Sequence, residues 1–259
     1  MEEIVMPIKY NEFNLEISAY IHKNSNKWIL CLHGLQSNKE IFKNLIPKSL
    51  FNNYSLLLID FIGFGYSSKP ENFSYDLIEQ AKIIEEIIKS LDMRNINLIG
   101  HSMGGMVGTL LLDMIPEKIS SIINMEGNLV LEDCGTSKDV ENLGFEEFHN
   151  AEFQKIKDNV KQSNEPSAKY REKWLKQIPD YAFYKSSLSI VEWSRSEKLL
   201  KIFLNSEHKK LFMYGNKNKQ KIKSLNNQIQ LAEISNAGHF MLIDNVEECN
   251  KQIEQFLQR

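Results

Sequence analysis

Short apolar runs alternate with amphipathic helical patterns through the first half of this 259-residue sequence. The runs at residues 28–32 and 54–59 are continuously apolar, which is typical of strands covered by helices on both faces of a sheet. Over residues 76–91, apolar residues recur at helical spacing and charged residues fill the other positions, which predicts a helix that covers a sheet. The same two patterns continue at residues 95–99, 103–115 and 119–125. This order predicts parallel strands joined by right-handed crossovers.

The two ends of the chain extend this pattern, with a long interruption between them. Residues 15–21 alternate polar and apolar, which predicts a half-buried edge strand in an N-terminal antiparallel pair. After residue 126 the strand pattern stops, and the next part of the chain is polar, helical in pattern and rich in aromatic residues. Structureless loops of that length are uncommon in compact domains, so the interval predicts a helical cap. Strand and helix patterns return at residues 210–214, 228–234 and 246–257.

We therefore expect an α/β fold, in which helices flank a mostly parallel, twisted sheet. Residues 1–128 and 196–259 form the predicted core, and residues 129–195 form the predicted cap inserted into it. One domain of this kind can reach the length of this chain and bury a large core.

The charge, the N-terminus and the cysteines restrict the possible partners, location and metal sites of this chain. The 31 basic and 34 acidic residues leave a net charge of −3, which provides no general attraction to nucleic acid or to an anionic membrane surface. The N-terminus carries acids where a signal peptide needs bases, and no apolar run approaches membrane-spanning length, so we expect a cytoplasmic protein. The 3 cysteines form no CxxC pair and no metal-ligand spacing such as HExxH occurs, so we expect no zinc or other metal site.

A Gly-x-Ser-x-Gly motif occurs at residues 100–104, between the predicted strand 95–99 and the helix that follows. In this context the motif is typical of a nucleophile elbow, a turn so tight that the serine takes a strained backbone conformation and the glycines avoid clashes of β-carbons. The serine also lies at a helix N-terminus, where developing negative charge is favoured. We predict that Ser102 is a nucleophile; the structural alternative is an ordinary glycine-rich turn.

A serine hydroxyl needs a general base, and histidine suits that role near neutral pH. His239 follows the last predicted strand, in a loop at a strand's C-terminal end, where open α/β sheets bind their ligands. We predict His239 as the base, with a structural surface histidine as the alternative. The other candidates precede the elbow, lie inside it, or belong to the predicted cap and a charged segment: His22, His33, His101, His149 and His208.

Four short stretches resemble the α/β-hydrolase superfamily: CLHGL at 31–35, DFIGFGYS at 60–67, GHSMGG at 100–105 and GHF at 238–240. Their order and spacing match that superfamily over nearly the whole chain outside the predicted cap. The resemblance implies that His33 and Gly34 open an oxyanion loop, in which the backbone N–H groups of Leu35 and Met103 bind the oxyanion. It also implies that His33 and Asp60 stabilise turns and take no part in catalysis.

The third catalytic residue departs from the commonest pattern of the superfamily. Many relatives have an aspartate just after the strand that corresponds to residues 210–214, where this chain has Asn218. An asparagine cannot stabilise an imidazolium as a carboxylate does. In a minority of relatives, including some haloalkane dehalogenases, the acid follows the strand after the elbow helix, where this chain has Glu126. We predict Glu126, and leave open Asp133, another carboxylate, or a serine–histidine dyad.

A serine at position 102 favours acyl transfer, because haloalkane displacement would need an aspartate there. We predict a carboxylesterase-like serine hydrolase that cleaves an ester-type bond of a small to medium apolar substrate through an acyl-enzyme on Ser102, without a cofactor. The aromatic residues of the predicted cap indicate the apolar substrate, although many should form the cap's own core. A C–C bond hydrolase, lyase or perhydrolase with the same residues is an alternative, and so is a non-catalytic ligand-binding receptor. The sequence does not determine the oligomeric state.

Overall fold

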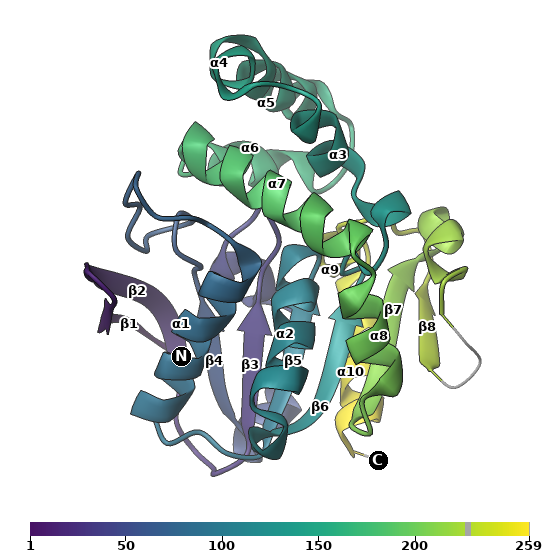
Figure 1. Ribbon diagram of the computed structural model, residues 1–259. Coiled ribbons are helices and arrows are strands. Elements are labelled where there is room, and N and C mark those ends of the chain that lie inside the picture. Colours follow the sequence, from purple (N-terminus) through teal and green to yellow (C-terminus); the bar gives the residue numbers. More distant parts are fainter. Residues whose placement is uncertain (226–228, 259) are drawn as a thin grey trace.

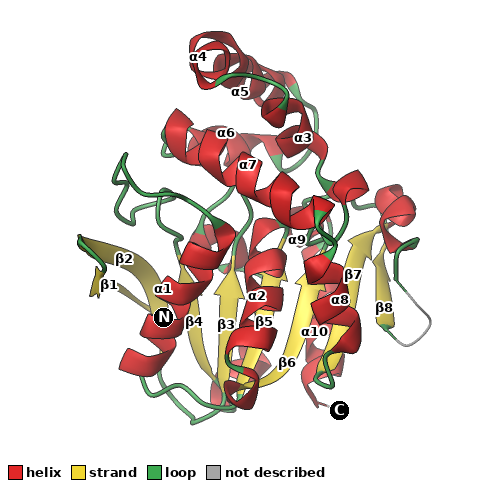
Figure 2. Cartoon of the chain, in the orientation of Figure 1, coloured by secondary structure: helices red, strands yellow, loops and turns green. Residues whose placement is uncertain are grey.

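The computed structural model describes residues 1–225 and 229–258. The described residues form an eight-stranded sheet with helices on both faces (Figures 1 and 2). In chain order, the strands are β1 (Glu2–Tyr10), β2 (Phe13–His22), β3 (Trp28–Leu32), β4 (Ser55–Ile59), β5 (Ile96–His101), β6 (Ile119–Met125), β7 (Lys209–Gly215) and β8 (Gln230–Ile234). Their order across the sheet is β1-β2-β4-β3-β5-β6-β7-β8.

The predicted α/β fold class is confirmed. β1 and β2 pair antiparallel, β2 pairs antiparallel with β4, and all other neighbouring strands are parallel. The strand predicted at 15–21 is part of β2, and β1 is its partner in the predicted antiparallel pair. The prediction of a half-buried edge strand was wrong, because β2 lies between β1 and β4 and all of residues 15–21 except Glu16 are buried. Gln228, the first residue of the strand predicted at 228–234, lies outside the described residues.

Two layers of helices cover the sheet. α1 (Leu77–Ser90), α2 (Met103–Met114) and α8 (Lys198–Asn205) lie on one face, and α10 (Val246–Gln258) lies on the other, with the short α9 (Met241–Asp244) preceding it (Figure 1). Every residue of β3 and β4 is buried because both faces of these central strands are covered. The periodic apolar residues of α1, such as Ile84 and Ile87, are buried in the larger core cluster, as their spacing predicted.

A group of helices between β6 and β7 lies over the C-terminal ends of the parallel strands (Figure 2). It contains α3 (Gly135–Glu141), α4 (Phe145–Glu147), α5 (Phe153–Gln162), α6 (Ala168–Leu175) and α7 (Asp180–Arg195). Three of its aromatic rings, those of Phe148, Phe153 and Phe183, pack on one another with centroids 5.3–5.9 Å apart. These rings are buried and form the core of the helical group itself.

Contacts from α7 join this helical group to the sheet layers. The Asp76 carboxylate accepts a hydrogen bond from Ile78 N at 3.0 Å, which caps the N-terminus of α1. The same oxygen accepts hydrogen bonds from Ser189 Oγ and Trp193 Nε1 of α7, each at 3.0 Å. The end of α1 and one face of α7 are therefore held together.

The strand register brings the loops at the C-terminal edge of the sheet together. Leu32 of β3 is beside Gly100 of β5, and His101 of β5 is beside Met125 of β6. Met125 is in turn beside Met213 of β7. The residues that follow these positions are consequently neighbours in space, although they are far apart in the sequence. No helix in the described ranges is long and apolar enough to span a bilayer.

Candidate active site

Ser102 occupies the sharp turn between β5 and α2. Its φ of 53° and ψ of −121° place it in the left-handed region of φ, which a residue with a β-carbon rarely adopts. Its N–H donates to Met125 O at 3.0 Å, and its carbonyl oxygen accepts from Gly105 N at 2.8 Å. The neighbouring strand and the first turn of α2 together hold the strained residue in place.

The two glycines of the motif are required by close backbone contacts. A β-carbon on Gly100 would lie 2.4 Å from the carbonyl oxygen of Gly104. A β-carbon on Gly104 would lie 1.9 Å from the carbonyl oxygen of Leu32. No larger residue fits either position without moving the backbone, so the glycines allow α2 to begin directly against β3 and β5.

The side chain of Glu126 lies directly beside His239. Glu126 follows β6 with a φ of 50°, and its side chain is fully buried. His239 Nδ1 lies 2.8 Å from Glu126 Oε2, within hydrogen-bond distance. Because a carboxylate is an acceptor, Nδ1 donates its proton in this contact, which leaves Nε2 as the basic nitrogen of the neutral ring.

Asn218 also binds the Glu126 carboxylate. Its Nδ2 donates to Glu126 Oε1 at 3.1 Å and to Oε2 at 3.0 Å, and Gly215 N donates to Oε1 at 2.9 Å. A buried carboxylate is stabilised by such donors, because it has lost its hydration. The asparagine in the position where many relatives have an acid therefore contacts the acid supplied by the neighbouring strand.

The loop that carries His239 is held from three sides. His101 Nε2 donates to the carbonyl oxygen of His239 at 2.8 Å. Asp244 Oδ2 accepts from Gly238 N at 3.0 Å, and Asn216 Oδ1 accepts from Ala237 N at 3.2 Å. His101, a rejected candidate for the base, thus helps to position the loop of His239.

The loop after β3 packs against Ser102 and is stabilised by His33. A β-carbon on Gly34 would lie 3.0 Å from Ser102 Cβ, so the two residues are in close contact. The His33 ring donates from Nδ1 to Gly34 O at 2.8 Å and accepts at Nε2 from Phe61 N at 3.1 Å. Burial of this ring lowers the pKa of His33 to about 4, so the ring is neutral near pH 7. Leu35 follows in this loop and lines the same pocket as Ser102.

Met103 is the first residue of α2, directly after Ser102. The N–H groups of the first turn of a helix have no acceptor within the helix, and the positive end of the helix dipole lies there. The backbone N–H of Met103 is one of these groups.

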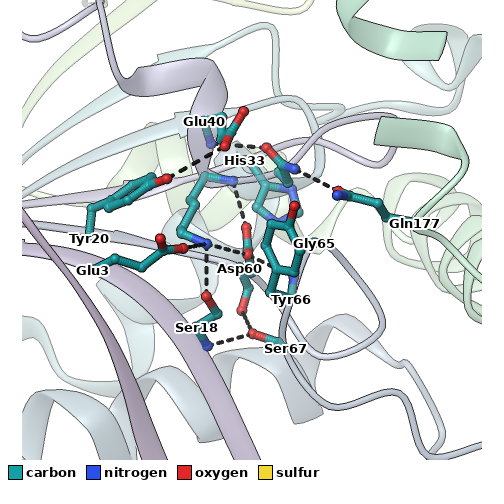
Figure 3. A network of polar contacts seen from close by, with 12 residues as sticks. Glu3, Ser18, Tyr20, His33, Glu40, Asp60, Gly65, Tyr66, Ser67 and Gln177 are labelled. Carbon is teal, nitrogen blue, oxygen red and sulfur yellow. Dashed lines mark hydrogen bonds and ion pairs between the residues drawn. The ribbon is translucent and has the colours of Figure 1, made fainter. Parts of the chain in front are cut away.

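Asp60, which directly follows β4, belongs to the polar network drawn in Figure 3. Its Oδ1 accepts from Lys39 N at 2.7 Å, and its Oδ2 accepts from Lys39 Nζ at 2.9 Å and from Tyr66 N at 3.0 Å. The Lys39 ammonium is fully buried and also contacts Ser18 Oγ at 2.8 Å and Glu3 Oε1 at 3.2 Å. Burial by itself would lower the pKa of Lys39, but the two carboxylates outweigh it and raise that pKa. The network joins β1, β2 and the turn after β4.

Comparison with known proteins shows the family of this chain. The family model described as "alpha/beta hydrolase fold" matches residues 27–246. The chain belongs to the α/β-hydrolase family. The solved structures agree in fold: a bromoperoxidase from Bacillus anthracis has a TM-score of 0.81 at 17% identity, with 100% of both chains covered. The esterase EaEST from Exiguobacterium antarcticum has a TM-score of 0.77 at 20% identity, covering 95% of this chain and 97% of that one.

Sequence similarity to curated members of the family is partial. The "Serine hydrolase-like protein" of Danio rerio is 30% identical over 125 residues. That match covers 48% of this chain and 37% of the Danio rerio protein, so this α/β-hydrolase matches less than half of its relative's length.

A pocket of about 390 Å³ opens at the C-terminal edge of the α/β-hydrolase sheet. Ser102, His239 and Leu35 line it, together with Phe240 and residues from the helices above. Glu126 lies behind His239 and is 0% exposed. Within the described residues no hydrogen bond joins Ser102 Oγ to His239; in many hydrolases this contact tightens only when substrate binds.

The pocket lining differs from what the sequence led us to expect. Most of the lining side chains are polar or charged, and Phe240 is the only Phe, Tyr or Trp among the described residues that line the pocket. The aromatic residues of the helical group were expected to contact an apolar substrate in part. Phe148, Phe153 and Phe183 pack on one another, which agrees with the expectation that many of these rings form the core of the helical group.

Sequence reasoning missed three residues around this site. Lys39 was not singled out, since nothing in the local sequence distinguishes a buried lysine from a solvated one. Gln36 and Arg171 line the pocket, and Arg171 comes from α6. Gln36 could have been noticed because it directly follows Leu35, whereas no signal in the sequence places Arg171 beside it.

Proposed function

We propose that this chain is a serine hydrolase that cleaves an ester-type bond through an acyl-enzyme on Ser102. The observation that carries the proposal is the 2.8 Å contact between Glu126 Oε2 and His239 Nδ1, beside a serine in the strained elbow conformation. A serine, a carboxylate and an imidazole, in the chain order Ser102, Glu126 and His239, are the parts of a Ser-His-acid triad. The names of similar proteins, among them a serine hydrolase-like protein and an esterase, support a hydrolytic role.

In the proposed mechanism, His239 Nε2 takes the proton of Ser102 Oγ as the hydroxyl attacks the substrate carbonyl. The backbone N–H groups of Leu35 and Met103 bind the oxyanion of the tetrahedral intermediate. His239 then protonates the leaving alcohol, and a water molecule activated by the same ring releases the acyl group. Glu126 keeps the Nδ1 proton in place and stabilises the imidazolium.

Two further predictions from the sequence stay proposals. We propose that residues 129–195 act as a cap, since α3 to α7 lie over the C-terminal edge of the sheet where the pocket opens (Figure 1). A cytoplasmic location also stays a prediction. The pocket volume suits a small to medium substrate, but its polar lining does not support the apolar substrate that the sequence suggested.

A fluorophosphonate probe tests the nucleophile directly. The probe should label the wild-type protein on Ser102, and the Ser102→Ala variant should not react although it remains folded. Circular dichroism and thermal unfolding of both proteins provide the folding control. A well-folded wild-type protein that resists the probe would support the non-catalytic receptor instead.

Turnover of p-nitrophenyl esters of increasing acyl length distinguishes the remaining alternatives. Hydrolysis that depends on Ser102 supports the ester-type reaction. Labelling by the probe without turnover of any ester, thioester or lactone would favour the C–C bond hydrolase, lyase or perhydrolase alternative, which uses the same residues.

A further inference from the structure

The pocket beside Ser102 carries both hydrogen-bond donors and acceptors, in addition to the proposed catalytic groups. It is lined by side chains from the oxyanion loop, from the segment after β6 and from the helical group. The polar residues that matter here are Gln36, Asn128, Asp133, Ser167, Arg171 and Asp244. A pocket built for an apolar acyl chain would bury few such groups, because each buried polar group without a partner costs free energy.

Arg171 provides donors on the side of the helical group. Its Nε and Nη2 donate to Gln36 Oε1 at 3.1 and 2.7 Å, and its Nη1 donates to Glu165 Oε2 at 2.9 Å. The guanidinium lies over the Phe240 ring, 4.6 Å from its centroid. These contacts use three of the five N–H groups of the guanidinium. They also orient the Gln36 amide, because its oxygen faces Arg171 and its NH2 group faces away.

Three buried polar atoms of the lining residues have no hydrogen-bond partner within the described part of the chain: Asn128 Oδ1, Ser167 Oγ and Asp244 Oδ1. Asn128 is 5% exposed and Ser167 is 1% exposed. Ser167 precedes Arg171 by four residues at the start of α6, so the two side chains lie on the same face of that helix. Buried polar atoms without partners are uncommon in folded proteins, and these three belong to residues that line the pocket.

The charges around the pocket disfavour an ionic substrate. Of the described lining residues, four carry carboxylates and one, Arg171, carries a guanidinium. A substrate anion would meet this excess of carboxylates, and a substrate cation placed beside Gln36 and Ser167 would meet the guanidinium of Arg171. A hydroxyl group can both donate and accept, so it can satisfy either kind of lining group without a charge.

We propose that the substrate is a neutral, hydroxyl-bearing ester, such as an ester of a polyol or sugar or of a hydroxy acid, whose hydroxyl groups bind between Arg171, Gln36, Asn128 and Ser167. This inference rests on the proposed hydrolase function and names the substrate class of that same site. Arg171 and Ser167 are then specificity-determining residues, and the Gln36 amide next to Leu35 binds the substrate close to the reacting carbonyl.

Matched pairs of esters test this substrate class. On the alcohol side, glycerol 1-butyrate is compared with n-butyl butyrate; on the acyl side, methyl 3-hydroxybutyrate is compared with methyl butyrate. We expect kcat/KM to be about tenfold higher for the hydroxylated member of at least one pair, the effect of one or two hydrogen bonds. Butyrylcholine and the butyrate ester of lactic acid add a cationic and an anionic substrate. A preference for either of these, or for both apolar esters, would overturn the inference.

Two matched pairs of variants locate the preference in the pocket. Ser167→Ala should reduce the ratio of hydroxylated to apolar kcat/KM several-fold, whereas Ser187→Ala should leave that ratio unchanged. Ser187 is also buried and without a partner among the described residues, but it does not line the pocket. Arg171→Met should reduce the ratio, and Lys169→Met, an exposed residue of the same helix, should not. Thermal unfolding of each variant confirms that it is folded.

The two proposals can fail separately. If Ser102 reacts with the fluorophosphonate probe and all esters are hydrolysed without a preference, the substrate class is wrong and the hydrolase function stands. If no ester is hydrolysed and the probe does not react, the proposed function itself is wrong.

Discussion

Replacement of Glu126 by glutamine tests the proposed triad most directly. The change keeps the size of the side chain but puts an amide nitrogen in the place of one carboxylate oxygen. Both oxygens of Glu126 face donors: Gly215 N at Oε1 and His239 Nδ1 at Oε2, with Asn218 Nδ2 near both. In one orientation the amide NH2 faces the Gly215 N–H, so that two donors meet without an acceptor. In the other it donates to His239 Nδ1, which moves the ring proton to Nε2 and removes the base.

The loss of charge sets the expected magnitude. In the proposed mechanism His239 becomes an imidazolium; since its Nδ1 lies 2.8 Å from Glu126 Oε2, the two charge centres are about 4 Å apart. At an effective dielectric constant of about 20, this attraction is about 4 kcal/mol. Each 1.36 kcal/mol of barrier changes the rate about tenfold, so Glu126→Gln should lower kcat about 10³-fold. Asn218→Ala removes neutral donors to the same carboxylate, and its cost of about 1 kcal/mol predicts a loss of tenfold or less.

The assay is steady-state hydrolysis of a reactive p-nitrophenyl ester by the wild type, Glu126→Gln and Asn218→Ala, with thermal unfolding as the folding control. The expected order is a large loss for Glu126→Gln and a small one for Asn218→Ala. If Asn218→Ala costs more than Glu126→Gln, or if Glu126→Gln stays within tenfold of the wild type, Glu126 is not the acid of the triad.

Three further predictions concern stability. In the unfolded chain the pKa of His33 is about 6.5, whereas burial lowers it to about 4 in the folded protein. The neutral buried ring therefore contributes fully to the free energy of unfolding above pH 6.5, and this contribution is lost as the pH falls towards 4. In urea unfolding, the free energy of unfolding of the wild type should therefore fall by about 2 kcal/mol between pH 7 and pH 5 because of His33. An equal fall in the His33→Phe variant would contradict this prediction. Gly104→Ala should cost more than about 3 kcal/mol or prevent folding, because its β-carbon would lie 1.9 Å from Leu32 O. The matched change Gly144→Ala, with φ −72° and no atom within 4 Å of the new β-carbon, should alter stability by less than about 1 kcal/mol; similar losses for both glycines would refute the packing argument. Lys39→Met leaves Asp60 without its buried cation and should cost about 3–5 kcal/mol in chemical denaturation, whereas the exposed Lys43→Met should cost under about 1 kcal/mol. Equal effects of the two lysine changes would show that the buried ion pair does not stabilise the fold.

Much of the fold followed from local patterns. The apolar runs of β3 and β4 and the periodicity of α1 depend on residues that are close in the sequence, and the structure confirms each of them. The elbow at Ser102 is of the same kind: its glycines meet backbone atoms of neighbouring turns and strands, a requirement that a five-residue motif can encode.

Sequence reasoning did not predict the contacts around Glu126 and Lys39. The sequence analysis set Asn218 aside because an asparagine cannot act as the acid, but in the structure its side chain donates to the Glu126 carboxylate, since β6 and β7 are adjacent in the sheet. The burial of Lys39 likewise depends on β1 and β2, which supply Glu3 and Ser18 from a distant part of the chain.

The sequence by itself was enough to predict the proposed reactive groups, because the Gly-x-Ser-x-Gly motif and the order of serine, acid and histidine lie in short stretches whose spacing reflects the order of the strands. Only the tertiary structure decided what surrounds Ser102. Phe148, Phe153 and Phe183 form a core within the helical group, whereas Arg171 of α6 contacts Gln36 at the pocket and Ser167, the residue before α6, lines the same pocket. Which face of a helix meets the sheet depends on the packing of several distant segments at once, and no local pattern records it.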